Sequence, residues 1–399
     1  ELYVDNNFSK KMYKYMVEDV DITGRQLIMV LFEQGFLDSE EEYALINEGR
    51  MSPYNFMLDA ISTKRITPAD LALKPCSGSC VMVDPDNGKV IALVSYPSYD
   101  NNKMSGTVDA EYYAKLSNDN SKPLTNYATQ AQNAPGSTFK ICSAVAGLDQ
   151  GVITTSTEFF CDGTFSETSP PARCWQRWGH GNETVSTAIR DSCNIYFYNV
   201  GFKLSKLKNG EFNDTYGINI LKNYAEQFGL ATTSGIEISE KLPHPSTIDV
   251  IRSAIGQGNH SYSALNLARY CSTIANSGTC YNLTLVDKIT DNSGNLIEEN
   301  QADVASTMDI NNGIWNAVHY GMYLATESYP ALANIGISVG SKTGTAQENE
   351  REPDHATMIS YAPYDDPQVA MAVIIRNGYG SGYTATLTAN ILKTYFGLE

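Results

Sequence analysis

Two side chains that could together carry out acyl transfer lie three residues apart. Ser137 and Lys140 follow the tripeptide Ala-Pro-Gly and are separated by Thr-Phe. A serine hydroxyl is a weak nucleophile at its ordinary pKa and needs a base within hydrogen-bond reach. A lysine can be that base when burial disfavours its charged form. An isolated Ser-x-x-Lys is more often an ordinary helix start with a solvated lysine, so this pair needs support from elsewhere in the chain.

A second motif, Ser192-Cys193-Asn194, supplies groups that such a pair would use. The hydroxyl of Ser192 could relay a proton between Lys140 and a leaving amine. The amide of Asn194 could hold Lys140 and accept the N–H of a substrate amide. We expect the tripeptide at the edge of a helix.

A third motif, Lys342-Thr343-Gly344-Thr345, comes late in the chain. Its small and β-branched surroundings predict a strand over residues 337–347 that lines a cleft. Lys342 adds positive charge, and Thr343 and Thr345 add hydroxyl groups that suit a substrate ending in a carboxylate. The N–H of Thr345 could complete an oxyanion hole with that of Ser137. Gly344 would allow a ligand to approach the backbone closely.

The pattern of strand-like and helix-like runs around these motifs predicts an α+β fold. We expect a central, mainly antiparallel sheet flanked by helices. Ser137 lies at the start of a helix that we expect to run to Gln150 and to stop at Gly151. Strand-like runs at 80–84 and 89–95 flank an Asn-Gly turn, and a second apolar pair occupies 356–362 and 369–375. Residues 1–75 form a polar helical segment, with starts expected after Ser39 and at Thr67-Pro68-Ala69-Asp70, and residues 76–399 form the catalytic domain.

Composition excludes several classes of protein. The 399 residues carry a formal net charge of −17, which argues against nucleic acid as a partner because such proteins cluster Lys and Arg. Hydrophobic residues make up 42% of the chain, enough for a substantial core. No run reaches the roughly 18–20 apolar residues that cross a bilayer. The eight cysteines are too sparse for a disulfide-built scaffold.

Two cysteines and a histidine form a candidate metal site shortly before the second motif. Cys161, Cys174 and His180 offer two thiolates and an imidazole, and Asp162 could add a carboxylate. This set would satisfy tetrahedral Zn²⁺ and would brace the cleft structurally. Two alternatives stay open, which are a Cys161–Cys174 disulfide and unpaired thiols with His180 packed nearby.

Together the motifs resemble those of the class B penicillin-binding proteins, which are peptidoglycan transpeptidases. The resemblance covers most of the chain from Pro75 to Leu398, and Trp178-Gly179-His180-Gly181 is similar to the cell-elongation branch, of Gram-positive, clostridial type. Besides the three motifs, the matching blocks are Val83-Asp84-Pro85, Ser95–Asp100, Ala134–Lys140, Ala254–Gly258, Ser341–Gln347 and Tyr361–Tyr364. Residues 1–75 resemble the lower part of the transpeptidase and the end of a pedestal region.

The resemblance implies a penicillin-binding transpeptidase (β-lactamase-like) fold and a role for each motif residue. Ser137 would be the acylated nucleophile and Lys140 the general base. Ser192, Asn194 and Lys342 would assist proton transfer and positioning, while Thr343 and Thr345 would hold the substrate carboxylate. Acyl transfer would need no cofactor.

The implied partners are peptidoglycan stem peptides, β-lactams, a membrane glycosyltransferase and cell-elongation proteins. The resemblance places the enzyme at the outer face of the cytoplasmic membrane, with an N-terminal anchoring helix that the given sequence does not include. The same residues would also serve a D,D-carboxypeptidase or a serine β-lactamase, which use water as acceptor. A non-catalytic β-lactam sensor or scaffold and, last, a zinc hydrolase built on Cys161, Cys174 and His180 complete the alternatives.

Overall fold

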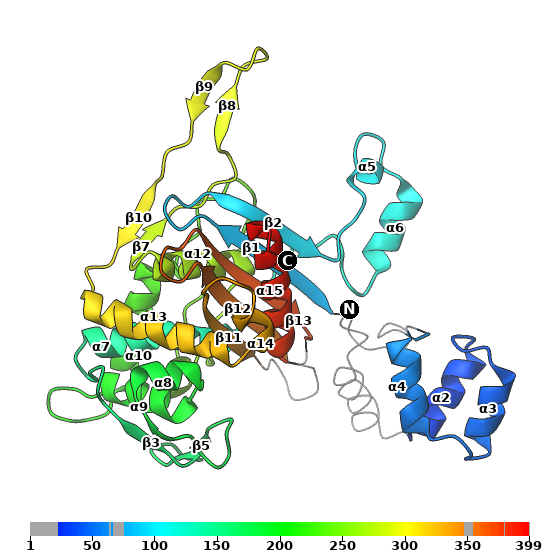
Figure 1. The fold of residues 1–399 in the computed structure, drawn as a ribbon, viewed down its shortest axis with the longest axis horizontal. Coiled ribbons are helices and arrows are strands. Elements are labelled where there is room, and N and C mark those ends of the chain that lie inside the picture. The colour runs from blue at the N-terminus through cyan, green and yellow to red at the C-terminus, as the bar shows by residue number, and fades with distance from the viewer. Residues whose placement is uncertain (1–22, 64, 67–75, 347–353, 379, 399) are drawn as a thin grey trace.

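A five-stranded antiparallel sheet forms the centre of the protein (Figure 1). The computed structural model describes residues 23–63, 65–66, 76–346, 354–378 and 380–398. The strand order is β11-β12-β13-β1-β2, so strands from the two ends of the chain lie side by side where β1 pairs with β13. The strands are β1 (Ser77–Val83), β2 (Val90–Tyr96), β11 (Gly340–Ala346), β12 (His355–Ala362) and β13 (Val369–Arg376). Both predicted strand pairs and the α+β class are confirmed.

Both faces of the sheet are covered by helices. Along β13, Ala370, Ala372 and Ile374 belong to the apolar core shared with the catalytic helices. The alternate residues Val369, Met371 and Val373 pack into a second cluster with helix α15 (Gly382–Phe396). Because successive side chains of a strand point to opposite faces, this double coverage explains why the run reads as continuously apolar.

The part of the chain between β2 and β11 forms helices that surround α7 (Lys140–Asp149). Every residue of α7 except the last is buried. The 3₁₀ turn η3 (Gly136–Phe139) leads directly into α7, so the predicted helix from Ser137 is confirmed with a tighter first turn. Gly151 follows in the left-handed region with φ +65° and stops the helix as predicted. The other elements of this region are α8 (Val185–Arg190), α9 (Asn194–Leu204), α10 (Asp214–Gln227), α11 (Val250–Ser253), α12 (Ala264–Ala275), α13 (Asn312–Glu327), α14 (Pro330–Ala333), β3 (Phe159–Cys161), β4 (Thr164–Phe165), β5 (Ala172–Arg173) and β6 (Gly181–Glu183).

Two outlying parts project from the body around the sheet (Figure 1). The paired strands β8 (Lys288–Thr290) and β9 (Leu296–Glu299) form a hairpin that extends beyond β7 (Thr279–Tyr281) and β10 (Val304–Thr307). The short helices α5 (Asn101–Met104) and α6 (Ala110–Asn118) follow β2.

The N-terminal helices have an apolar cluster of their own. They are α2 (Gly24–Glu33), α3 (Glu40–Asn47) and α4 (Pro53–Ser62), and the cluster that joins them reaches Cys76 and Tyr383. Ser39 accepts the N–H of Glu42 at the start of α3, as the sequence predicted. The expected helix start at Thr67–Asp70 lies outside the described residues, and a domain division at residue 75 stays a prediction. None of the helices in the described part of the chain combines the length and apolarity needed to span a bilayer.

Candidate active site

The turn that carries Ser137 is fixed against strand β11 by two glycines. Gly136 has φ +55°, and a Cβ atom there would lie 2.5 Å from the carbonyl oxygen of Thr345. A Cβ on Gly344 would lie 2.4 Å from the carbonyl oxygen of Pro135. Both positions therefore require glycine, because the two backbones touch. The close approach expected of a ligand at Gly344 is thus made by the protein's own chain.

Lys140 lies fully buried beneath the turn and joins the first motif to the second. Its Nζ donates to the carbonyl oxygen of Ser192 at 2.7 Å, to Oδ1 of Asn194 at 2.7 Å and to Oγ of Ser192 at 3.2 Å. Burial lowers the pKa of Lys140 to about 8. A substantial neutral fraction near neutral pH is what a lysine base requires.

The second motif connects helices α8 and α9. Ser192 lies in the left-handed region at φ +52°, which is uncommon for a residue with a side chain. Helix α9 then begins at Asn194, with Cys193 as its N-cap. The strained turn and the helix start together direct the polar groups of Ser192 and Asn194 toward Lys140. The prediction of a helix edge is confirmed.

The third motif brings a second buried amine to the same hydroxyl. Nζ of Lys342 lies 3.1 Å from Oγ of Ser192 and 3.1 Å from the carbonyl oxygen of Thr343. Burial, together with the charge of Lys140, lowers the pKa of Lys342 well below its ordinary value. The hydroxyl of Thr343 lies 2.9 Å from that of Tyr329, a residue that sequence reasoning had not selected.

These groups share one cleft of about 570 Å³. Ser137, Ser192, Asn194, Thr343 and Thr345 line it, while the two lysines lie buried behind the lining. The structure therefore brings every predicted catalytic residue to a single site. Ile255 and Gln257 also line the cleft and belong to the matching block Ala254–Gly258, to which the sequence had assigned no role. The remaining lining residues were missed because no short motif marks them, and they are Trp175, Arg190, Asp191, Ser328, Tyr329 and Ser381.

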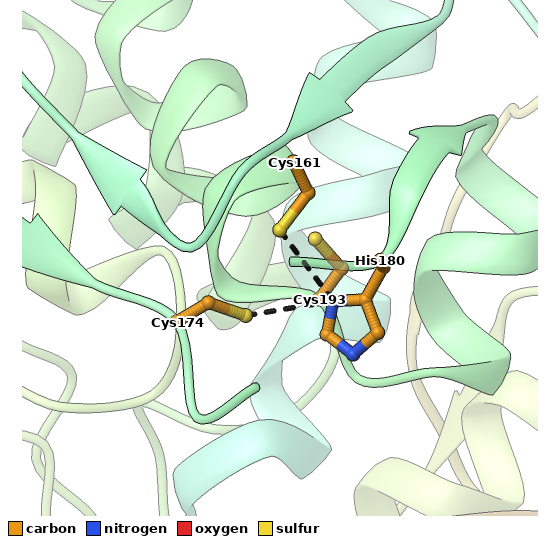
Figure 2. Close-up of side chains that lie close together, drawn as sticks. All are labelled: Cys161, Cys174, His180 and Cys193. Atoms are coloured by element: carbon orange, nitrogen blue, oxygen red, sulfur yellow. Dashed lines mark hydrogen bonds between the residues drawn. The ribbon is translucent and has the colours of Figure 1, made fainter. Parts of the chain in front are cut away.

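Three of the candidate metal ligands, Cys161, Cys174 and His180, converge with Cys193 of the second motif (Figure 2). Cys161, Cys174, His180 and Cys193 each place one ligand atom within 4.8 Å of the other three. Nδ1 of His180 lies 3.5 Å from Sγ of Cys161 and 3.6 Å from Sγ of Cys174. Four N and S donors at such spacing match the chemistry of a closed zinc site.

The expected fourth ligand was wrong. Asp162 is exposed, and its carboxylate accepts the backbone N–H of Thr164 at 2.9 Å, outside the cluster. Cys193 instead places its sulfur atom beside those of Cys161 and Cys174 and the ring of His180, and it does not line the cleft. All three thiols of the cluster are free, so the structure contains no Cys161–Cys174 disulfide.

The cluster also has the electrostatics of a ligand set. A hydrogen bond from the thiol of Cys193 lowers the pKa of Cys174 to about 4, which favours its thiolate. The backbone N–H of Asn194 donates to the same sulfur at 3.4 Å. Nε2 of His180 is buried without a hydrogen-bond partner in the described structure.

Comparison with known proteins agrees with this geometry. A family profile described as the penicillin binding protein transpeptidase domain matches residues 78–396. The peptidoglycan D,D-transpeptidase MrdA of Haemophilus influenzae is 31% identical over 89% of this chain and 60% of its own length. MrdA of Escherichia coli K12 is 29% identical over 78% of this chain and 53% of its own length. The chain thus spans little more than half of these relatives.

Solved structures show the same fold. Pseudomonas aeruginosa PBP2 in complex with WCK 5153 aligns with a TM-score of 0.70 and 26% identity, over 80% of this chain and 73% of that one. Penicillin-binding protein A of Mycobacterium tuberculosis, as a ceftriaxone acyl-enzyme, aligns with a TM-score of 0.71 and 25% identity, over 80% and 74% of the two chains. Family match, relatives and site geometry agree, and the chain belongs to the penicillin-binding protein transpeptidase family, within class B.

Proposed function

We propose that this chain is a serine D,D-transpeptidase that cross-links peptidoglycan stem peptides. The observation that carries the proposal is the convergence of Lys140 and Lys342 on the Ser192 hydroxyl, in the cleft that Ser137 lines. The D,D-transpeptidase names of the relatives support the same activity. The ceftriaxone acyl-enzyme of Mycobacterium tuberculosis penicillin-binding protein A supports covalent acylation by β-lactams, which resemble the D-Ala–D-Ala end of the substrate.

In the first half of the reaction, neutral Lys140 accepts the proton of Ser137, and Oγ attacks the carbonyl carbon of the penultimate D-alanine. The N–H groups of Ser137 and Thr345 stabilise the oxyanion. The peptide C–N bond breaks as Lys140 returns the proton through the Ser192 hydroxyl to the leaving D-alanine amine. Asn194 holds Lys140 and the substrate amide, and Lys342 positions the Ser192 hydroxyl for proton transfer. Thr343 and Thr345 bind the terminal carboxylate.

The pH dependence of acylation follows from the lowered pKa of Lys140. Since the base must be neutral, the rate constant for acylation by a fluorescent penicillin should rise about tenfold per pH unit below pH 8 and level off above it. Stopped-flow or quenched-flow labelling between pH 6 and pH 10 measures this profile. The variant Lys140→Gln should be slow at every pH, and a flat wild-type profile between pH 6 and pH 9 would contradict the assignment.

The acceptor decides between a transpeptidase and a hydrolase that uses the same site. We expect cross-linked dimers when the protein is incubated with a pentapeptide donor and an amine-bearing stem peptide, detected by mass spectrometry. If the products are D-alanine and tetrapeptide, with no cross-linked dimer, the protein is a carboxypeptidase. Fast repeated turnover of a β-lactam would identify a β-lactamase, and failure to acylate would identify a sensor or scaffold.

We further propose that Cys161, Cys174, His180 and Cys193 bind a structural Zn²⁺. Support comes from four converging donors, the favoured thiolate of Cys174 and the position of Nδ1 of His180, which faces the sulfur atoms of Cys161 and Cys174. When bound, zinc would supply charge neutralisation and a fixed anchor, since all four positions are filled by protein. Because Cys193 lies between Ser192 and Asn194, the anchor would hold the second motif in place. The acyl-transfer steps themselves use only the side chains described above.

For its cellular role, we propose assembly with a membrane glycosyltransferase and cell-elongation proteins at the outer face of the cytoplasmic membrane. A structural neighbour with 27% identity and a TM-score of 0.68 belongs to a peptidoglycan synthase complex that coordinates polymerisation and cross-linking. A transpeptidase must act where new strands emerge, which supports this location and a membrane anchor. The clostridial type of the chain, and the division into a helical segment of residues 1–75 and a transpeptidase domain of residues 76–399, are parts of the same proposal.

A further inference from the structure

An arginine and an aspartate immediately before Ser192 are the charged residues that line the cleft in the described part of the chain. Nε of Arg190 donates to Oδ1 of Asp191 at 2.8 Å, and Nη2 donates to Oδ2 at 2.7 Å. The two side chains are 40% and 26% exposed, so both remain accessible to a bound molecule. No step of acylation described above uses either residue.

The aspartate is held in place by its backbone. Its N–H donates to the carbonyl oxygen of Thr187 at 2.8 Å, and its carbonyl oxygen accepts the indole N–H of Trp175 at 3.0 Å. Asp191 therefore presents its carboxylate from a fixed position at the end of α8. A group held this way loses little freedom when it binds a ligand, so it is suited to recognition.

The charge around this pair is unbalanced toward the negative. Glu183 is buried, and burial raises its pKa to about 7, so its carboxyl group is partly protonated near neutral pH. The carboxylates of Asp191 and Glu327 therefore make up the fixed negative charge around the guanidinium of Arg190. Such a field attracts a cationic ligand to this end of the cleft.

The position of the pair relative to the acyl group identifies the ligand. The leaving amine departs past Ser192, which relays its proton, and an incoming amine must reach the same carbonyl carbon by the reverse path. Arg190 and Asp191 adjoin Ser192 in the sequence and line the same cleft. A cationic ligand held there is the acceptor amine before it reacts.

We propose that Arg190 and Asp191 form the acceptor subsite and select an amine whose own carbon carries a carboxylate. This inference rests on the proposed transpeptidase function. The acceptor's ammonium would bind Asp191, and the acceptor's carboxylate would bind Arg190. The two charges of the acceptor would thus take the place that each side chain of the Arg190–Asp191 ion pair has for the other. A simple alkyl amine, such as a lysine side chain, offers no partner for the guanidinium and binds less well.

The transfer step balances with groups already placed. The bound ammonium gives one proton through the Ser192 hydroxyl to neutral Lys140, and the amine nitrogen attacks the ester carbonyl carbon. The new C–N bond forms, the ester C–O bond to Ser137 breaks, and the second amine proton goes to Oγ of Ser137. The products are the free hydroxyl, the amide cross-link and protonated Lys140, which loses its proton to solvent.

The test measures how the acyl-enzyme divides between amine and water. The protein is given a D-alanyl thioester donor with either D-alanine or D-alaninamide, compared at equal concentrations of free base, and both products are quantified by chromatography. Wild type should favour D-alanine by about tenfold, the value of one charged hydrogen bond. Arg190→Gln should bring this preference to within about twofold of unity, and Asp191→Asn should lower aminolysis by both amines about tenfold.

A second Arg–Asp pair provides matched controls. Arg252 and Asp249 are paired at 2.5 Å with similar exposure, 46% and 33%, and neither lines the cleft. Arg252→Gln and Asp249→Asn should keep the wild-type product ratio. Arg190→Lys, which keeps the charge, should recover part of the preference for D-alanine.

The outcomes separate this inference from the proposed function. If wild type does not form an acyl-enzyme, the transpeptidase proposal fails and the subsite fails with it. If wild type acylates but uses the two amines equally, or uses neither, the subsite is overturned and the acylating site stands. A wild-type ratio of the two aminolysis products in Arg190→Gln would also overturn the subsite. Because the side chain of Arg190 is 40% exposed, this variant should fold and gives a result even if Asp191→Asn does not fold.

Discussion

Ser137→Ala is expected to abolish covalent labelling by a fluorescent penicillin, with a loss of at least about 10³-fold in the acylation rate constant. The physical reason is that the variant has no oxygen to form the acyl bond, while Lys140 and Lys342 keep their hydrogen bonds to Ser192. Intact-protein mass spectrometry after exposure to penicillin measures the effect directly, because each acylation adds the mass of one β-lactam.

A matched control lies on α7, the helix that follows the turn of Ser137. Ser143 is buried on α7, and its hydroxyl donates to the carbonyl oxygen of Ala254 at 2.8 Å, away from the cleft. Ser143→Ala should lose about 1 kcal/mol of stability and should still be labelled. Labelling of Ser137→Ala at the wild-type rate would show that another residue is the nucleophile, and the proposed mechanism would be wrong.

The second large effect is expected at Cys193. Cys193→Ala should reduce bound zinc from about one ion per chain to a small fraction, since loss of a ligand opens a closed tetrahedral site. Penicillin labelling should fall as well, by about tenfold or more, because the same backbone turn positions Ser192 and Asn194. Elemental analysis of the purified protein and labelling kinetics measure the two quantities.

Two variants serve as controls for the metal site. Cys142→Ala removes a buried thiol on α7 that lies outside the cluster, so both zinc content and labelling should persist. Asp162→Ala should also keep its zinc, which separates the proposed ligand set with Cys193 from the set with Asp162 that the sequence predicted. If wild-type protein prepared with zinc in the medium contained none, or if Cys193→Ala bound as much as wild type, the zinc proposal would be refuted.

A zinc hydrolase predicts the opposite pattern. In that case chelation would remove activity and Ser137→Ala would retain it. The structure disfavours this alternative, since four protein donors fill a tetrahedral set and leave no position for substrate or water. The pair of experiments on Ser137 and Cys193 therefore decides which site performs the chemistry.

The sequence alone determined the local part of this protein. The Asn-Gly turn between two β-rich runs predicted β1 and β2, and the apolar pair at the end of the chain predicted β12 and β13. The position of Ser137 at a helix start followed from Pro135 and Gly136, which cannot continue a preceding helix. These features could be derived because turn chemistry and side-chain periodicity act over a few neighbouring residues.

Only the tertiary structure decided what these elements bring together. Lys140 and Lys342 are desolvated because helices and strands from distant parts of the chain bury them. Their lowered pKa values are a consequence of that burial. Cys193, and not Asp162, joins Cys161, Cys174 and His180, because the folded chain brings the second motif against the segment that carries those three residues. Desolvation and convergence depend on packing between segments far apart in the chain, and local sequence patterns carry no information about that packing.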